Sequence, residues 1–301
     1  GNQLQYYEQS DGQLSFSFDE KCSESADSKR PYKAVVTKVY DVTGDGGIDM
    51  VDVAELFKSG DNALTQLNGD GDFRSLECVN LLDEADIVVT NPPFSLFRYF
   101  VSLIVEHQKN FVIIGNQNAI SYEETFSLMK NNKMWIGASI HSGDRAFFVP
   151  DDYPLDAAGC GIDEETGRKY IRVKGVRWFT NLDIKQRHEE MILVRRYVPD
   201  EYPTYVNYNA IEVAKTSDIP CDYSGEMGVP ITFMDKYNPD QFEIVGISRE
   251  LVRTLSDDVR KNGAYPQIGR FYLDTGEAKY KKVYERLVIR NKHPEVPKGA
   301  Q

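Results

Sequence analysis

Residues 87–94, Ile-Val-Val-Thr-Asn-Pro-Pro-Phe (IVVTNPPF), decide the fold that the sequence predicts. The first four are β-branched and apolar enough for a buried strand, and the strand stops at two prolines, which cannot donate a backbone hydrogen bond. Each proline fixes its own φ and pushes the residue before it towards extended geometry. We therefore expect a rigid turn in which carbonyl oxygens, freed from strand pairing, point outward.

Strands and helices alternate after this turn. Helical spacing is expected over residues 96–107, a second apolar strand over 111–115, and a third strand over 134–138. Ser121 and Glu124 have the spacing of a capping box for a helix over 122–131. Uniformly apolar strands separated by amphipathic helices predict a parallel sheet with helices on both faces, a doubly wound α/β fold of the Rossmann-like class.

The whole chain divides into three predicted regions. Residues 1–67 form a polar entry region with an acidic loop, 68–145 the α/β core, and 146–301 a β-rich region. In the core, Ser75 is expected to cap a helix. In the β-rich region, strand-like alternation covers residues 170–181, 191–198, 243–248 and 285–291.

Charge and composition exclude some classes of function. With 35 basic and 47 acidic side chains the formal charge is −12, which argues against a general polyanion binder. The basic stretch 166–196 leaves two interpretations open, a confined positive face or charges spread over a solvated surface. No apolar run is long enough for a bilayer span, and the four scattered cysteines favour reduced thiols in a cytoplasmic protein.

The Asn-Pro-Pro-Phe turn itself suggests chemistry. The Asn91 amide oxygen and a neighbouring carbonyl would form two fixed acceptors, which suit an exocyclic amine with two hydrogens. Phe94 offers a flat apolar face on which a planar base can stack. Ligands of doubly wound sheets bind beyond the carboxyl ends of the strands, where residues 91–94 and 115–118 are both expected.

Five stretches carry a resemblance to a known family. They are GDGDFRS (69–75), ADIVVTNPPFSLFR (85–98), IGNQNAI (114–120), WFTNLD (178–183) and DYSGEMGVPITF (222–233). Together they resemble the EcoRI-type adenine-specific DNA methyltransferases, which use S-adenosylmethionine and whose catalytic motif is (Asp/Asn/Ser)-Pro-Pro-(Tyr/Phe/Trp). The resemblance implies an N6-adenine methyltransferase whose region 146–301 recognises the DNA target.

The resemblance also assigns roles to residues. Asn91 and the Pro92 carbonyl would accept hydrogen bonds from the adenine N6 amine, with Pro93 completing the motif and Phe94 stacking on the base. Asp72 and Phe73 match a pair that holds the cofactor's adenine ring, the alternative being an ordinary acidic turn. Trp178 or Phe179 would supply a second stacking ring, the alternative being two core residues.

The mechanism that the resemblance implies needs no covalent enzyme intermediate. Oriented acceptors would stabilise the positive charge that develops as N6 becomes tetrahedral. The target adenine would be flipped out of double-stranded DNA, since its N6 is inaccessible inside a duplex. A cognate restriction endonuclease would belong to the same system. The competing hypothesis is a non-catalytic DNA-recognition or calcium-stabilised interaction protein on the same scaffold.

The sequence departs from the family before Asn68. Family members place a cofactor-binding strand and loop, a helix and a second strand ahead of the GDGDF segment, and no convincing strand–turn–helix loop is found there. We therefore expect an N-terminally truncated core that binds S-adenosylmethionine weakly or not at all.

Residues 41–52 have the spacing of an EF-hand-like calcium loop, with glycine at the sixth position and an apolar residue at the eighth. The predicted ligand set is Asp41, Thr43, Asp45, Gly47, Asp49 and Asp52. The alternative is a solvated acidic turn.

Overall fold

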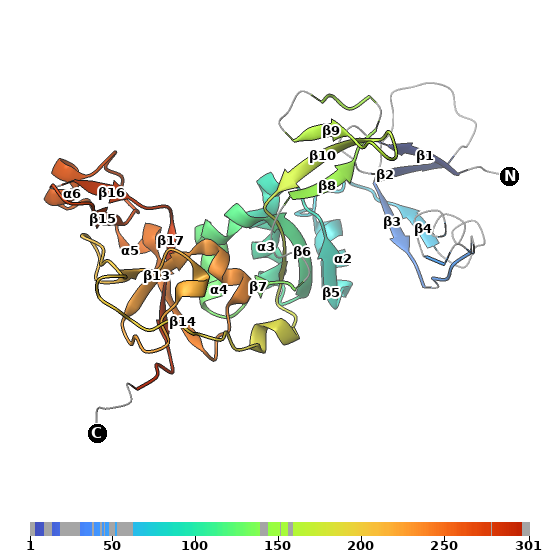
Figure 1. Ribbon diagram of the computed structural model, residues 1–301. Coiled ribbons are helices and arrows are strands. Elements are labelled where there is room, and N and C mark those ends of the chain that lie inside the picture. The colour runs from blue at the N-terminus through green and yellow to red at the C-terminus, as the bar shows by residue number, and fades with distance from the viewer. Residues whose placement is uncertain are drawn as a thin grey trace. The chain divides into compact units, whose positions relative to one another are not determined.

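The protein is described from a computed structural model (Figure 1). The structure describes residues 4–8, 14–18, 31–37, 39–42, 44, 46–47, 52, 63–138, 144–150, 152–155, 159–277 and 279–296. The chain forms two compact units. Unit 1 comprises residues 1–86 and 144–174, and unit 2 comprises residues 87–143 and 175–301. These units divide the chain differently from the three predicted regions, because residues 144–174 group with the N-terminal part.

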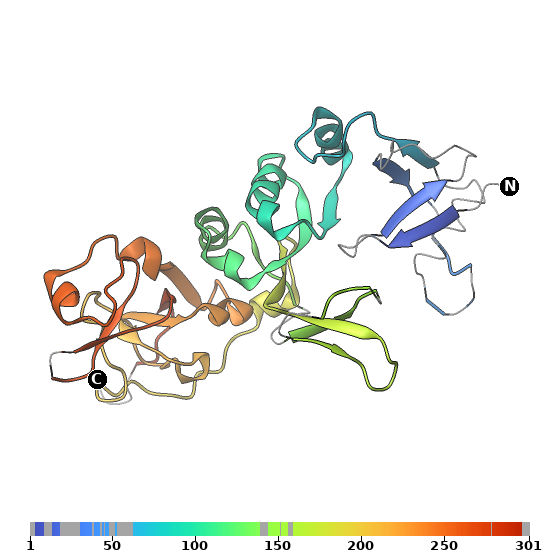
Figure 2. The same cartoon turned by 90° about the horizontal axis from the view of Figure 1, so that it is seen from above.

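In its described residues, unit 1 contains small antiparallel sheets and the helix that begins at Leu76. Its two-stranded sheets are β1 (Leu4–Glu8) with β2 (Leu14–Phe18) and β3 (Tyr32–Val35) with β4 (Ala63–Gln66). Its three-stranded sheet has the order β8 (Asp144–Phe148), β10 (Lys169–Lys174), β9 (Cys160–Ile162), and is yellow-green in Figure 2. Residues 51–58 have helical spacing in the sequence and, except for Asp52, lie outside the described residues.

Helix α2 (Leu76–Glu84) begins where the sequence predicts. Ser75 has extended backbone geometry, and its hydroxyl oxygen accepts a hydrogen bond from the Cys78 N–H at 3.2 Å. The predicted cap is confirmed.

Unit 2 contains a four-stranded mixed sheet with the order β5 (Ile87–Thr90), β6 (Asn110–Asn116), β11 (Val176–Thr180), β7 (Trp135–Ile136). β5 and β6 are parallel, with Thr90 opposite Ile113, whereas β11 is antiparallel to both of its neighbours. The mixed α/β class is confirmed, but the prediction of a uniformly parallel sheet is wrong because β11 lies between β6 and β7.

Burial in this sheet also differs from the prediction. β5 is an edge strand, and the side chains of Ile87 and Val89 are 49% and 68% exposed. β6 has a buried apolar face formed by Phe111 and Ile113, and β11 buries Val176 and Phe179. An apolar run alone cannot distinguish an edge strand from a central one.

Helices α3 (Phe97–Glu106) and α4 (Glu123–Lys130) contact each other, and α3 contacts β6 (Figures 1 and 2). The apolar stripe of α3, Phe97, Val101 and Ile104, is buried as its spacing predicts. The capping box of α4 is absent: Tyr122 is the N-cap and makes no side-chain cap. Ser121 is the last residue of η2 (Gln117–Ser121), one position before the N-cap, and its hydroxyl donates to the Asn118 carbonyl at 2.9 Å.

The C-terminal part of unit 2 surrounds a second four-stranded sheet. Its order is β12 (Ile211–Glu212), β13 (Glu226–Pro230), β17 (Arg286–Asn291), β14 (Phe242–Ile247). Around it lie η3 (Lys185–His188), η4 (Thr216–Asp218), η5 (Ile231–Lys236), α5 (Ser248–Leu251), α6 (Asp257–Asn262), β15 (Tyr272–Asp274) and β16 (Tyr280–Lys282).

Aromatic stacking and a buried ion pair hold this region together. The Tyr205 ring stacks on Phe271 with ring centroids 4.4 Å apart. Arg286 binds Glu212 through both carboxylate oxygens, with a shortest distance of 2.6 Å, and Tyr205 donates to the same carboxylate. The pair joins β12 to β17, and its two side chains are only 7% and 12% exposed. Breaking such a buried pair from one side costs about 3–5 kcal/mol.

The β segments predicted within residues 146–301 agree with the structure to different extents. Residues 243–248 and 285–291 correspond to β14 and β17. Residues 170–181 are two strands, because Gly175 has φ +71° and separates β10 in unit 1 from β11 in unit 2. Residues 191–198 form no strand; within the described chain they make one isolated bridge, from Arg195 to Pro220.

Among the described residues, no helix has the length and apolar character needed to cross a membrane.

Candidate active site

The Asn-Pro-Pro-Phe turn follows β5 directly and presents its polar groups outward. Asn91, Pro93 and Phe94 are exposed, whereas Pro92 is buried and anchors the turn. The Pro93 carbonyl accepts from the Leu96 N–H at 2.9 Å and so opens η1 (Phe94–Leu96). Within the described part of the chain, no hydrogen-bond partner is found for the Asn91 side chain or the Pro92 carbonyl. Two oxygen acceptors thus remain available at the turn.

Close packing fixes the helix that follows this turn. Phe97, the first residue of α3, packs edge-to-face on Phe179 of β11, with ring centroids 5.0 Å apart. Gly115 of β6 makes room for both rings, since a Cβ there would lie 2.5 Å from Phe97 and 2.9 Å from Phe179. The backbone after Phe94 is therefore held against the carboxyl end of β6.

A second turn lies at this end of β6. η2 (Gln117–Ser121) begins where Asn116 accepts from the Asn118 N–H at 2.9 Å. The Gln117 N–H donates to the Gly175 carbonyl at 2.6 Å. Because β5 and β6 are parallel, η2 and the Asn91 turn leave the same edge of the sheet, as the sequence predicts.

Arg177 of β11 is a buried charge that the sequence analysis did not single out as a candidate. Its side chain is 2% exposed and pairs with Asp235 of η5, with Nε 3.0 Å from Oδ1. One of its terminal nitrogens also donates to the Gln117 amide oxygen at 2.8 Å. The only signal in the sequence was an arginine inside the apolar strand Val-Arg-Trp-Phe-Thr.

The two candidate stacking rings differ in burial. Phe179 is fully buried against Phe97, which is the environment of a core residue. Trp178 is half-buried, and its carbonyl accepts from the Gly137 N–H at 2.8 Å. A ring with no exposed surface cannot receive an incoming base without local opening, so of the two only Trp178 is kept as a candidate.

Asp72 and Phe73 belong to unit 1, whereas the Asn91 turn belongs to unit 2. The Asp72 carboxylate accepts from the backbone N–H and the Nε of Arg74, both at 2.9 Å. Hydrogen bonds from the Arg74 side chain and backbone lower the pKa of Asp72 to about 2, so the carboxylate is ionised at neutral pH. The Arg74 guanidinium also lies 5.5 Å from the centroid of the Phe73 ring.

The described residues of the acidic loop do not support the predicted calcium site. Asp41 accepts from the N–H groups of Gly44 and Gly46, and the buried Asp52 accepts from the Val42 N–H at 2.9 Å. Among the predicted ligands, Thr43, Asp45 and Asp49 lie outside the described residues. No group of three or more His, Cys, Asp or Glu side chains suited to a metal occurs in the described chain. We propose no metal site.

The basic stretch 166–196 does not form one surface within a single unit. Its first part, with Lys169 and Arg172, lies in unit 1, and the remainder lies in unit 2. In unit 2, Arg196 is paired with Asp222 at 3.3 Å and with Glu295 at 2.8 Å, and Arg177 is buried.

Comparison with known proteins covers both units. Residues 5–292 match the family model described as "Adenine-specific methyltransferase EcoRI". The chain is 48% identical over 187 residues to the type II methyltransferase M.EcoRI of Escherichia coli; the match covers 62% of this chain and 57% of M.EcoRI, so less than two thirds of that relative is spanned. It is 38% identical over 229 residues to M.MpnI of Mycoplasma pneumoniae, covering 75% of this chain and 70% of the relative. No solved structure matches significantly.

Proposed function

Because the chain belongs to the family of EcoRI-type adenine-specific methyltransferases, we propose that it is a site-specific DNA methyltransferase acting on adenine N6. The observation that carries the proposal is the Asn91 turn: an exposed amide oxygen and a carbonyl oxygen, both without partners in the described chain, stand beside a 40% exposed phenylalanine ring.

The two acceptors compensate for the low nucleophilicity of adenine N6. The N6 lone pair is delocalised into the ring, and the nitrogen becomes tetrahedral and positively charged only as it reacts. The Asn91 oxygen and the Pro92 carbonyl accept the two N6 hydrogens and stabilise that charge more strongly in the transition state than in the ground state. Rigidity helps here, because the prolines leave little backbone to reorganise.

The Phe94 ring orients the base. With 40% of its surface exposed at the start of η1, it can stack on a planar heterocycle. An adenine within a duplex cannot reach this turn, so double-stranded DNA is bound with the target base flipped out. Trp178, half-buried on β11, is the candidate for a second ring.

S-adenosylmethionine, when bound, supplies an electrophilic methyl group on a sulfonium centre. The residues proposed to hold its adenine are Asp72 and Phe73. An ionised carboxylate fits a hydrogen-bond donor such as an exocyclic amine, although Arg74 competes for the same oxygens. The class of the relatives supports a restriction-modification role, with a cognate endonuclease as the proposed partner system and the cytoplasm as the proposed location.

Substitution of Asn91 in the full-length protein tests the proposal. Asn91→Ala should lower methyl transfer at least about a hundredfold, the cost of removing one preorganised polar group from comparable sites. Asn91→Asp retains an oxygen acceptor and should keep measurable activity. Affinity for duplex DNA, measured by fluorescence anisotropy, should stay within about threefold of wild type in both variants. DNA binding without methyl transfer in the wild type would favour a non-catalytic recognition protein.

A further inference from the structure

Two arginines connect η2 to the C-terminal part of unit 2. Arg177 binds the first residue of the turn, Gln117, and Arg249 of α5 binds the last, donating to the Ser121 carbonyl at 3.1 Å. Each arginine is in turn fixed by a carboxylate from the C-terminal part, Asp235 and Glu285 respectively. Both ends of η2 are therefore held by arginines that pair with carboxylates of the C-terminal part.

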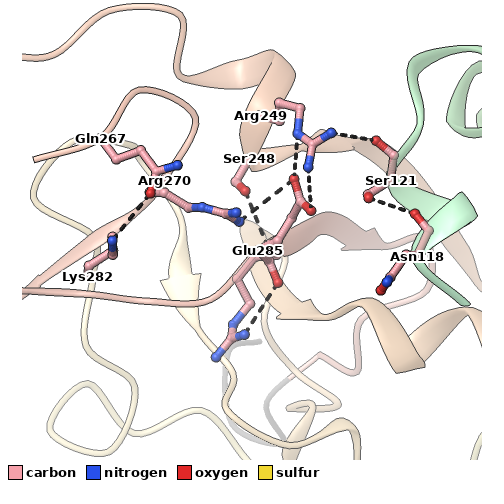
Figure 3. A network of polar contacts seen from close by, with 9 residues as sticks. Asn118, Ser121, Ser248, Arg249, Gln267, Arg270, Lys282 and Glu285 are labelled. Atoms are coloured by element: carbon pink, nitrogen blue, oxygen red, sulfur yellow. Dashed lines mark hydrogen bonds and ion pairs between the residues drawn. The ribbon is translucent and has the colours of Figure 1, made fainter. Parts of the chain in front are cut away.

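Figure 3 shows the arrangement around Arg249. Its Nε and one terminal nitrogen each lie 3.1 Å from a different oxygen of Glu285, and its other terminal nitrogen reaches Ser121. Glu285 is only 13% exposed, and Arg270 lies 3.8 Å from the same carboxylate. The guanidinium therefore pairs with the Glu285 carboxylate, with one hydrogen bond to Oε2, and keeps a donor for Ser121, a planar arrangement that the single ammonium of lysine does not reproduce.

Hydrogen bonds within η2 connect Ser121 to the end of β6. The Ser121 hydroxyl donates to the Asn118 carbonyl at 2.9 Å, and the Asn118 N–H donates to the Asn116 side chain at 2.9 Å. Asn116 is the last residue of β6. A chain of hydrogen bonds therefore links Glu285, next to β17, with the carboxyl end of β6.

The turn also adjoins the helix that follows the catalytic motif. The Arg98 guanidinium in the first turn of α3 lies 5.3 Å from the centroid of the Tyr122 ring, and 3.8 Å from a Glu124 oxygen. Arg98, Tyr122, Ser121 and Arg249 line one open pocket of about 430 Å³. A displacement of η2 would therefore reach the start of α3, four residues from Phe94.

We propose that Arg249, together with Arg177, is a positioning residue for methyl transfer. The two side chains hold η2 at the edge of the sheet where the Asn91 turn also lies, and link η2 to Asp235 of η5 and to Glu285, the residue before β17. This inference rests on the proposed function. Neither arginine touches the reacting atoms, and misplacement of a site by about 1 Å can cost on the order of a hundredfold in rate. For the half-exposed Arg249 we expect a loss of about tenfold in kcat.

Hydrogen–deuterium exchange of the protein without DNA tests the structural step separately from catalysis. Arg249→Ala should speed exchange of the backbone amides of residues 118–122 at least about fivefold, and Arg249→Lys should give a smaller change. Arg253→Ala is the matched control: this exposed side chain lines the same pocket, but its Nε donates to the Glu250 carbonyl. Equal exchange in Arg249→Ala and Arg253→Ala would overturn the inference, even if the wild type proved to methylate no DNA.

Steady-state kinetics tests the catalytic step. Arg249→Ala should lower kcat about tenfold, with KM for duplex DNA and the thermal midpoint close to wild type, while Arg253→Ala keeps wild-type kcat. Faster exchange with unchanged kcat would show that η2 does not position the reaction and would overturn the inference. If the wild type lacks methyl transfer, the proposed function fails, and the exchange experiment alone decides whether Arg249 holds the turn.

Discussion

Asn91 illustrates how two prolines convert a strand end into a pair of acceptors. Pro92 is buried and Asn91 exposed, so the residue that carries the proposed chemistry is anchored by its successor. Of the two proline carbonyls, that of Pro93 accepts from the Leu96 N–H, and no partner is found for that of Pro92 within the described residues. A residue with a backbone N–H at position 92 or 93 would add a donor and conformational freedom at this point.

Gly115 allows a test at the scale of one methyl group. Gly115→Ala places a Cβ 2.5 Å from the Phe97 ring and 2.9 Å from the Phe179 ring, and both rings are fully buried. Overpacking of this kind costs about 1–3 kcal/mol. We expect the free energy of unfolding in urea to fall by that amount, together with methyl transfer, because Phe97 begins the helix after the motif.

Gly69→Ala is the control for this substitution. The nearest atom to a Cβ at Gly69 is a Glu77 oxygen at 3.5 Å, an ordinary contact. A urea midpoint for Gly115→Ala equal to that of the control would contradict the packing argument.

At the residue scale, sequence could predict what is local. The Asn-Pro-Pro-Phe turn, the Ser75 cap and the buried stripe of α3 depend on neighbours within a few positions, and the structure agrees with the cap and the stripe. The ion pair of Arg177 involves Asp235, which is 58 residues away, and no local sequence pattern predicts such a pair. The Ser121 capping box is absent because η2 extends through Ser121 and α4 begins one residue later than predicted, with Tyr122 as its N-cap.

At the scale of elements, the position of β11 determines the strand order and the mixed character of the sheet. Residues 170–181 alternate as one β segment, yet the positive φ of Gly175 divides them and sends β11 antiparallel between β6 and β7. Periodicity reports that a segment is a strand but not which strands it joins, and the pairing of β11 with β6 spans some sixty residues. The sequence therefore predicted the elements of the core and not their order.

η3, which follows β11, offers a pH-dependent test. His188 lies 2.6 Å from an Asp183 oxygen, and this hydrogen bond raises the pKa of His188 above its usual value of 6.5. Because the folded-state pKa is the higher one, the stabilisation is complete below pH 6.5 and is lost as the pH rises through the raised pKa. NMR titration of the His188 ring should show the raised pKa in the wild type.

Asp183→Asn should return the His188 pKa towards 6.5. The free energy of unfolding of Asp183→Asn should be lower than that of the wild type, and this difference should shrink as the pH rises above the wild-type pKa of His188. A His188 titration that Asp183→Asn leaves unchanged would exclude the pair as the cause.

At the scale of the whole molecule, an acidic chain is proposed to bind a polyanion. With a formal charge of −12, and with Arg177 buried and Arg196 paired to carboxylates, we expect only a few phosphate contacts. The slope of log Kobs against log salt concentration should be shallower than about −5, since each contact contributes about −0.9. Anisotropy titrations between 50 and 200 mM salt measure it, and a slope near −10 would require a broad basic surface instead.

The identity of the methylated product tests the central claim most directly. Duplex DNA incubated with the full-length protein and S-adenosylmethionine is digested to nucleosides and analysed by mass spectrometry. We expect N6-methyl-2′-deoxyadenosine as the only modified nucleoside, and its loss in Asn91→Ala. Methylation of cytosine, or an adenine product that is undiminished in Asn91→Ala, would contradict the account.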